Sequence, residues 1–91
     1  MKQDNDEFLH MYPSNLREII DIVSGVIFQT FPNIKEKVVK DKLKYIDVSK
    51  GFVCSIFVKE EVVILEFKNK KKMNFDSLDS ISKNEIIDLL S

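Results

Sequence analysis

The segment from Gly51 to Lys68, GFVCSIFVKEEVVILEFK, is the longest concentration of apolar residues in the chain. It is rich in Val, Ile and Phe, which suit a pleated, half-buried strand better than a helix. The charged triplet Lys59-Glu60-Glu61 divides it into two runs of strand length. We therefore predict a β-hairpin. Because the triplet contains no Asn-Gly or Asp-Gly pair, we expect a loop of three or four residues between the arms.

Both faces of this hairpin are largely apolar. Alternation on the first arm places Phe52, Cys54, Ile56 and Val58 on one face, and Val53, Ser55 and Phe57 on the other. On the second arm it sets Val63, Leu65 and Phe67 against Val62, Ile64 and Glu66. Such strands are typical of the centre of a sheet, which we expect to be covered by helices on one face and by the termini on the other. We accordingly expect Phe52, Phe57 and Phe67 to be core residues.

Two helices are predicted before the hairpin. Over residues 15–31 an apolar stripe recurs at helical spacing, Asn15 and Glu18 have the spacing of reciprocal capping residues, and Pro32 ends the helix. Asn33 and Glu36 repeat that spacing, so a second helix is expected over residues 34–42. It would offer Ile34, Val38 and Val39 to the core.

Further strands and a last helix complete the pattern. Residues 43–48 are predicted to be a strand, with Lys44, Ile46 and Val48 on one face and Leu43, Tyr45 and Asp47 on the other. Residues 73–75 are read as a short edge strand after the basic turn at 68–72. Ser82 and Glu85 form a capping box, and Ile81 with Ile86 fits a hydrophobic staple, which together predict a C-terminal helix.

These elements predict an α+β fold in the order α-α-β-β-β-β-α, with an antiparallel sheet packed on the helices. The 91 residues make one domain, 1–91, in which we expect residues 1–6 to be frayed. The apolar share of 44% and charged share of 32% are ordinary for a globular domain. The single Cys54 cannot form an internal disulfide, and the chain has neither a signal peptide nor an apolar run near 18 residues. We therefore expect a cytoplasmic protein with no membrane association.

The residues able to carry chemistry are few. Cys54 is expected to be a buried, inert thiol, and His10 a surface side chain. Acidic residues at two places in the sequence could attract a cation through oxygen ligands, although nothing in the pattern fixes their geometry. These weak metal candidates are Asp4, Asp6, Glu7, Glu18 and Asp21.

Lysines dominate the middle of the chain, where residues 35–72 carry eleven positive and six negative side chains. Nine of these lysines lie in two groups: Lys35, Lys37, Lys40, Lys42 and Lys44, and the candidate anion-binding group Lys68, Lys70, Lys71 and Lys72. A phosphate-binding patch is one interpretation, and a solvated surface is the other. The only arginine of the chain lies outside this region, and bidentate phosphate or base contacts prefer arginine. We therefore expect no specific nucleic-acid binding.

The order of features resembles the YdhG-like family, a domain of unknown function. The likeness covers roughly residues 7–90 and rests on Thr30-Phe31-Pro32, on Lys44-Tyr45, on the two hairpin arms and on the closing segment from Met73 to Ile81. Family members often carry a longer loop after the second arm, where this chain has only the lysine turn. Some members are described as frataxin-like iron carriers, so the resemblance implies iron as an alternative cargo.

Our first functional hypothesis is a small non-enzymatic binding module for an unknown protein or small molecule, with no cofactor. An iron carrier is the alternative, and a lysine-patch binder of RNA or another acidic partner is a third hypothesis. We do not expect an enzyme, because no base, nucleophile and orienting group come together in the sequence. The sequence predicts neither the ligand nor the oligomeric state.

Overall fold

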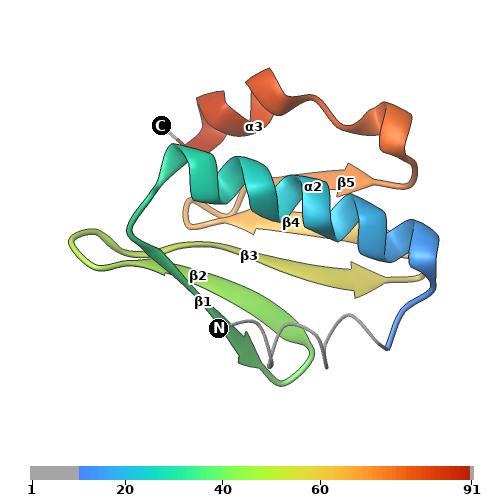
Figure 1. The fold of residues 1–91 in the computed structure, drawn as a ribbon, viewed down its shortest axis with the longest axis horizontal. Helices are drawn as coiled ribbons and strands as arrows, with labels where there is room; N and C mark the ends of the chain where they lie inside the picture. The colour runs from blue at the N-terminus through green and yellow to red at the C-terminus, as the bar shows by residue number, and fades with distance from the viewer. Residues whose placement is uncertain (1–10, 91) are drawn as a thin grey trace.

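Residues 11–90 are described by a computed structural model, in which five consecutive strands follow one long helix (Figure 1). The expectation that residues 1–6 are frayed lies outside this range. The elements are α2 (Ser14–Thr30), β1 (Ile34–Val39), β2 (Lys42–Asp47), β3 (Gly51–Lys59), β4 (Val62–Phe67), β5 (Lys72–Phe75), a 3-10 turn η1 (Leu78–Ser80) and α3 (Lys83–Leu90). The strands form an antiparallel sheet in the order β1-β2-β3-β4-β5, and the helices lie on one side of it. The predicted small α+β domain with an antiparallel sheet packed on helices is confirmed.

Helix α2 forms where the apolar stripe predicted it, one residue earlier at each end. Leu16, Ile19, Ile20, Val23 and Ile27 are all buried. The predicted cap is wrong, because the helix begins at Ser14 and Asn15 already lies within it. No side chain caps the helix; instead the Pro13 carbonyl accepts hydrogen bonds from the N–H groups of Leu16 and Arg17, each at 3.1 Å.

The predicted second helix over residues 34–42 is wrong. Residues 34–39 form the edge strand β1, which pairs with β2 from Ile34 opposite Asp47 to Val39 opposite Lys42. Ile34, Glu36 and Val38 alternate with Lys35, Lys37 and Val39, so the segment also carries the two-residue period of a strand. The β-branched valines favour that period, and the sheet supplies the partner that a six-residue pattern cannot reveal.

The central hairpin is confirmed, but its loop is shorter than predicted. Lys59 lies opposite Val62, so only Glu60 and Glu61 form the turn. Both adopt positive φ, 54° and 64°. A two-residue turn of this kind matches the twist of the flanking strands, and here it forms without the glycine or asparagine that usually accompanies it.

A β-bulge changes the facing of the start of β3. Tyr45 lies opposite Cys54, whereas its neighbour Ile46 lies opposite Phe52, which leaves Val53 as the extra residue. The predicted alternation therefore fails at Phe52 and Val53. Phe52 lies on the same face as Ile46, and Val53 is buried.

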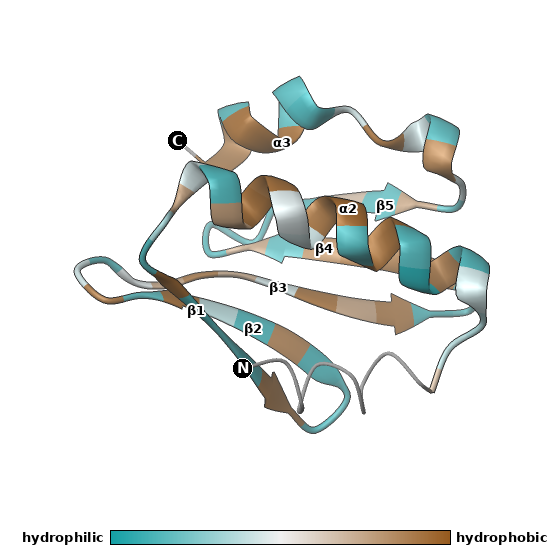
Figure 2. Ribbon diagram, viewed as in Figure 1, coloured by the Kyte–Doolittle hydropathy of each residue, from teal (hydrophilic) through white to brown (hydrophobic). Residues whose placement is uncertain are grey.

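The sheet has two faces of different character. Its inner face packs on the helices and holds Leu43, Tyr45, Cys54, Ile56, Val63, Leu65, Phe67 and Phe75, all buried. The predicted facing of residues 43–47 and of the second hairpin arm is confirmed by the burial of Leu43, Tyr45, Val63 and Leu65. Brown apolar bands alternate with teal polar ones on α2, as expected for a helix with one face in this core (Figure 2).

Helix α3 closes the inner face. The Glu85 N–H donates to Ser82 Oγ at 3.4 Å, which is one half of the predicted capping box. Ile86 is fully buried, and Ile81 is half-buried against the same core, as the predicted hydrophobic staple requires. The short strand predicted at residues 73–75 is confirmed as β5, at the edge of the sheet.

Candidate functional site

The face of the sheet directed away from α2 and α3, which we call the open face, carries most of the strand lysines. The pairing register gives its residues: Lys35, Lys37, Val39, Lys42, Lys44, Ile46, Phe52, Ser55, Phe57, Lys59, Val62, Ile64, Glu66, Lys72 and Asn74. Neither described helix covers this face. The prediction placed the chain termini over it, and residues 1–10 and 91 lie outside the described residues. Six lysines and one glutamate make it basic, although the whole chain has a net charge of −1.

One cross-strand row concentrates this charge. Lys37 lies directly opposite Lys44, and Lys44 lies opposite Ser55. The row continues through Glu66 to Lys72. Like charges directly opposite each other destabilise a sheet. The Lys37–Lys44 pair therefore costs stability and places two lysines at directly opposite positions on the open face.

Aromatic rings lie between the lysines. The Lys42 Nζ atom is 4.8 Å from the centre of the Phe57 ring, and the Lys44 Nζ atom is 6.0 Å from that of Phe52. Both are within the range of cation–π attraction. Phe52 is 39% exposed, whereas Phe67 is buried. The prediction of a core role is thus confirmed for Phe67. It is wrong for Phe52, which the bulge turns to the open face, and for Phe57, which is half-buried on that face.

The lysines of the predicted anion-binding turn do not form one group. Lys72 belongs to the open face, where it lies opposite Glu66. Lys68 instead lines a hollow on the opposite side of the sheet. Lys70 and Lys71 are exposed in the turn, and Lys70 has a φ of 72°. Recognition of an anion by the turn as a unit has no geometric support here.

The metal candidates are only partly described. Asp4, Asp6 and Glu7, like His10, lie outside the described residues. Glu18 and Asp21 are exposed on α2. Glu18 borders a shallow hollow together with Asp76 and Asp79, which Asp21 does not line. Within residues 11–90, no three His, Cys, Asp or Glu side chains lie close enough together to hold a metal ion.

A partly buried polar cluster, which the sequence analysis missed, joins α2 to the edge of the sheet. Ser24 Oγ and the Tyr45 hydroxyl donate to the same oxygen of Glu36, Oε2, at 3.1 and 2.5 Å. The Tyr45 oxygen is also 3.0 Å from Ser24 Oγ. Burial, followed by the charge of Glu36, raises the pKa of Tyr45 far above its ordinary value. The hydroxyl stays protonated, so the cluster anchors β1.

Cys54 is buried, as predicted. Burial raises the pKa of its thiol to about 12. The thiolate is the reactive form of cysteine, and it is scarce at neutral pH when the pKa is so high.

No family model, curated protein or solved structure matches this chain. The resemblance to the YdhG-like family and the iron alternative that it implies therefore stay predictions. None of the helices among the described residues has the length and apolar character needed to span a bilayer.

Proposed function

We propose that this domain is a non-enzymatic binding module whose open face takes an acidic protein segment with apolar side chains between its carboxylates. The observation that carries the proposal is the juxtaposed pair Lys37 and Lys44 beside the exposed ring of Phe52. In a reducing cytoplasmic setting, which fits the lone buried thiol of Cys54, such a surface would be available to other proteins.

Charge and apolar area alternate on this face at strand spacing. Lys37 and Lys44 would contact carboxylates, while Ile46 and Phe52, one cross-strand row away, would contact apolar side chains. Positive and negative surfaces that match in this way steer association and fix the register of a partner. Aromatic side chains, Phe among them, are enriched in the cores of protein interfaces.

A protein segment is favoured over a nucleic acid by the state of the rings. Single-stranded nucleic acids bind to such surfaces by stacking bases on exposed aromatic faces. Here the ammonium groups of Lys42 and Lys44 lie near the Phe57 and Phe52 rings, at 4.8 and 6.0 Å. A base would have to displace Lys42 from the Phe57 ring, whereas a carboxylate can approach the same lysine where it stands.

The test is a titration of isotope-labelled protein, at 150 mM salt, with three probes. They are a peptide that alternates Glu with Leu and Phe, a peptide of equal charge that alternates Glu with Ser, and single-stranded oligo-dT. We expect the first peptide to shift the backbone amides of β1, β2 and β3 and to bind more tightly than the second. Tighter binding of oligo-dT, or no difference between the two peptides, contradicts the proposal.

A pair of variants with equal net charge locates the site. Neutralising Lys37 and Lys44 to Gln should weaken binding of the Glu/Leu/Phe peptide about tenfold, or about 1.4 kcal/mol. The control, Lys70→Gln with Lys83→Gln, removes the same charge from the β4–β5 turn and from α3, away from the open face. If the control loses as much affinity as the first variant, binding depends on overall charge and the proposed site is wrong.

A further inference from the structure

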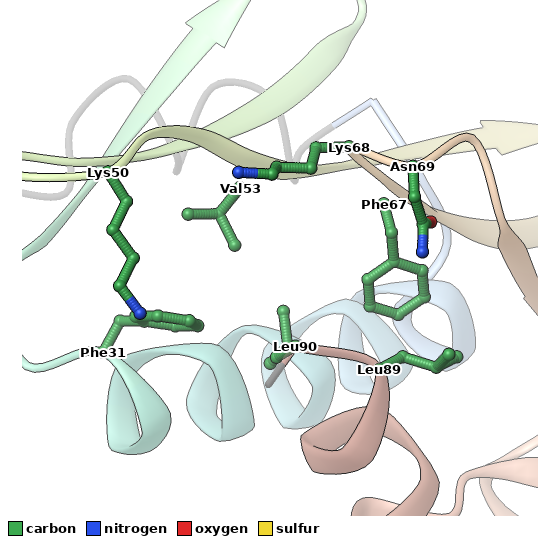
Figure 3. Close-up of a pocket in the computed structure, with 8 residues that line it drawn as sticks. All are labelled: Phe31, Lys50, Val53, Phe67, Lys68, Asn69, Leu89 and Leu90. Atoms are coloured by element: carbon green, nitrogen blue, oxygen red, sulfur yellow. The ribbon is translucent and has the colours of Figure 1, made fainter.

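A hollow of about 240 Å³ lies on the helix-bearing side of the sheet, where the β2–β3 and β4–β5 turns meet α3 and the end of α2 (Figure 3). Its walls come from four separate parts of the chain. Phe31, Val53, Phe67, Leu89 and Leu90 are the apolar residues that line it, and Lys50, Lys68 and Asn69 are the polar ones. It is therefore distinct from the open face proposed above as a protein-binding surface.

The bulge in β3 creates one wall of this hollow. Because Val53 is the extra residue, its side chain is buried on the helix side, next to that of Cys54. The Val53 carbonyl accepts a hydrogen bond from the Lys68 N–H at 3.0 Å. This bond ties the start of β3 to the turn after β4 and places the Lys68 side chain over the hollow, toward Val53 (Figure 3).

Hydrogen bonds within the β2–β3 turn fix the position of Lys50. One oxygen of Asp47, Oδ2, accepts from the Ser49 hydroxyl at 2.7 Å and from the N–H groups of Ser49 and Lys50 at 3.1 Å each. The same bonds lower the pKa of Asp47. From this turn the Lys50 side chain reaches the Phe31 ring, with Nζ 5.2 Å from the ring centre.

Asn69 supplies a third polar group. Its Oδ1 atom accepts a hydrogen bond from the Lys71 N–H at 3.1 Å, which holds the side chain in place. The amide nitrogen is directed toward the Leu89 side of the hollow (Figure 3). The rim thus offers two ammonium groups and one amide donor, and none of the described residues that line the hollow is acidic.

We infer that this hollow binds a small carboxylate with an apolar body, whose carboxylate lies between Lys50 and Lys68 and whose body contacts Phe31, Phe67 and Leu90. A charged head and an apolar body are both needed, because the rim is cationic and the walls are apolar. The hollow lies below the range of about 300–1,000 Å³ usual for drug-sized ligands. The ligand is therefore an aromatic or short-chain aliphatic acid.

Four probes test this inference by amide chemical-shift titration of the whole chain at pH 7. They are benzoate, hexanoate, acetate and benzyl alcohol. We expect benzoate or hexanoate to shift the amides of the β2–β3 and β4–β5 turns and of α3, and to bind at least tenfold more tightly than acetate or benzyl alcohol. Equal binding of hexanoate and acetate would show that the apolar body contributes nothing to binding. Equal binding of benzoate and benzyl alcohol would show the same for the carboxylate. Either result overturns the inference.

Matched variants place the ligand. Lys68→Gln should weaken binding of the better acid about tenfold, equivalent to about 1.4 kcal/mol, while Lys70→Gln, two residues away in the same turn, should leave it unchanged. Lys70 does not line the hollow. Equal losses in the two variants overturn the inference. Both lysines are exposed, so both variants are expected to fold, and amide spectra of the free variants check this.

The open-face variants at Lys37 and Lys44 should bind the acid normally. The experiments can therefore contradict the acid-binding hollow without contradicting the protein-binding surface, and the reverse.

Discussion

The two faces of the sheet are built from the same strands but have different compositions. Leu43 and Tyr45 of β2 are fully buried against the helices, whereas Lys42 and Lys44, their sequence neighbours, belong to the open face. The inner face holds the core, and it leaves the open face free to carry charges that do not help the fold. The Lys37–Lys44 pair is the clearest case, because it places like charges directly opposite each other. The core of the inner face can therefore stabilise strands whose open face carries a destabilising pair of like charges.

The largest expected difference between the faces is at adjacent residues of β4. Leu65 is fully buried on the inner face, and Ile64 is half-buried on the open face. Leu65→Ala should lower the free energy of unfolding by about 2–5 kcal/mol, because it leaves a cavity in the core. Ile64→Ala should cost clearly less. Urea unfolding measures both, and equal losses would contradict the assignment of the faces.

A smaller effect is expected in the polar cluster of the inner face. Tyr45→Phe keeps the ring but removes the hydroxyl that donates to Glu36 Oε2. Because hydrogen bonds to charged groups contribute about 1.5–3 kcal/mol, we expect a loss of that order in the free energy of unfolding. Ser24→Ala removes the longer bond to the same oxygen and should cost less. A Tyr45→Phe variant as stable as the parent would show that the cluster does not anchor β1.

The smallest predicted effect has the opposite sign. Lys37→Glu converts the like-charge pair with Lys44 into an opposite-charge pair, so we expect a gain in stability of about 0.2–1 kcal/mol. The same change should weaken binding of the acidic peptide. Lys35→Glu is the control, because Lys35 lies opposite the apolar Ile46. A gain at Lys35 as large as that at Lys37 would assign the effect to net charge.

Long periodic segments predicted the fold well, and short ones did not. Helix α2 carries enough repeats for its period to be distinct, and the hairpin of β3 and β4 is identified by its length and its Val, Ile and Phe content. Residues 34–39 do not, since Ile34 and Val38 satisfy a helical spacing and an alternating one equally. What decides between them is tertiary structure. The segment pairs with β2, and the carboxylate of Glu36 meets Ser24 and Tyr45, 12 and 9 residues away in sequence.

The β-bulge in β3 determines which residues line the two candidate sites, and an alternating sequence pattern cannot reveal a bulge. A bulge inserts one residue into one strand, so a pattern read from that strand alone gives Phe52 and Val53 the wrong faces. The lysines of both sites were identified in the sequence as charges. Their division between the open face and the hollow depends on strand pairing, which places Lys72 opposite Glu66 and Lys68 beside Val53.

The position of Glu36 also bears on self-association. It lies on β1, an edge strand of the described sheet, with its side chain on the inner face. The unpaired backbone groups of an edge strand are a template for strands of other chains, and an inward-pointing charge is one of the devices by which proteins prevent such pairing. An added strand from a second copy would extend the inner face over a carboxylate that Ser24 and Tyr45 already hold. The residue that fastens β1 to its own helix thus also discourages growth of the sheet into an aggregate.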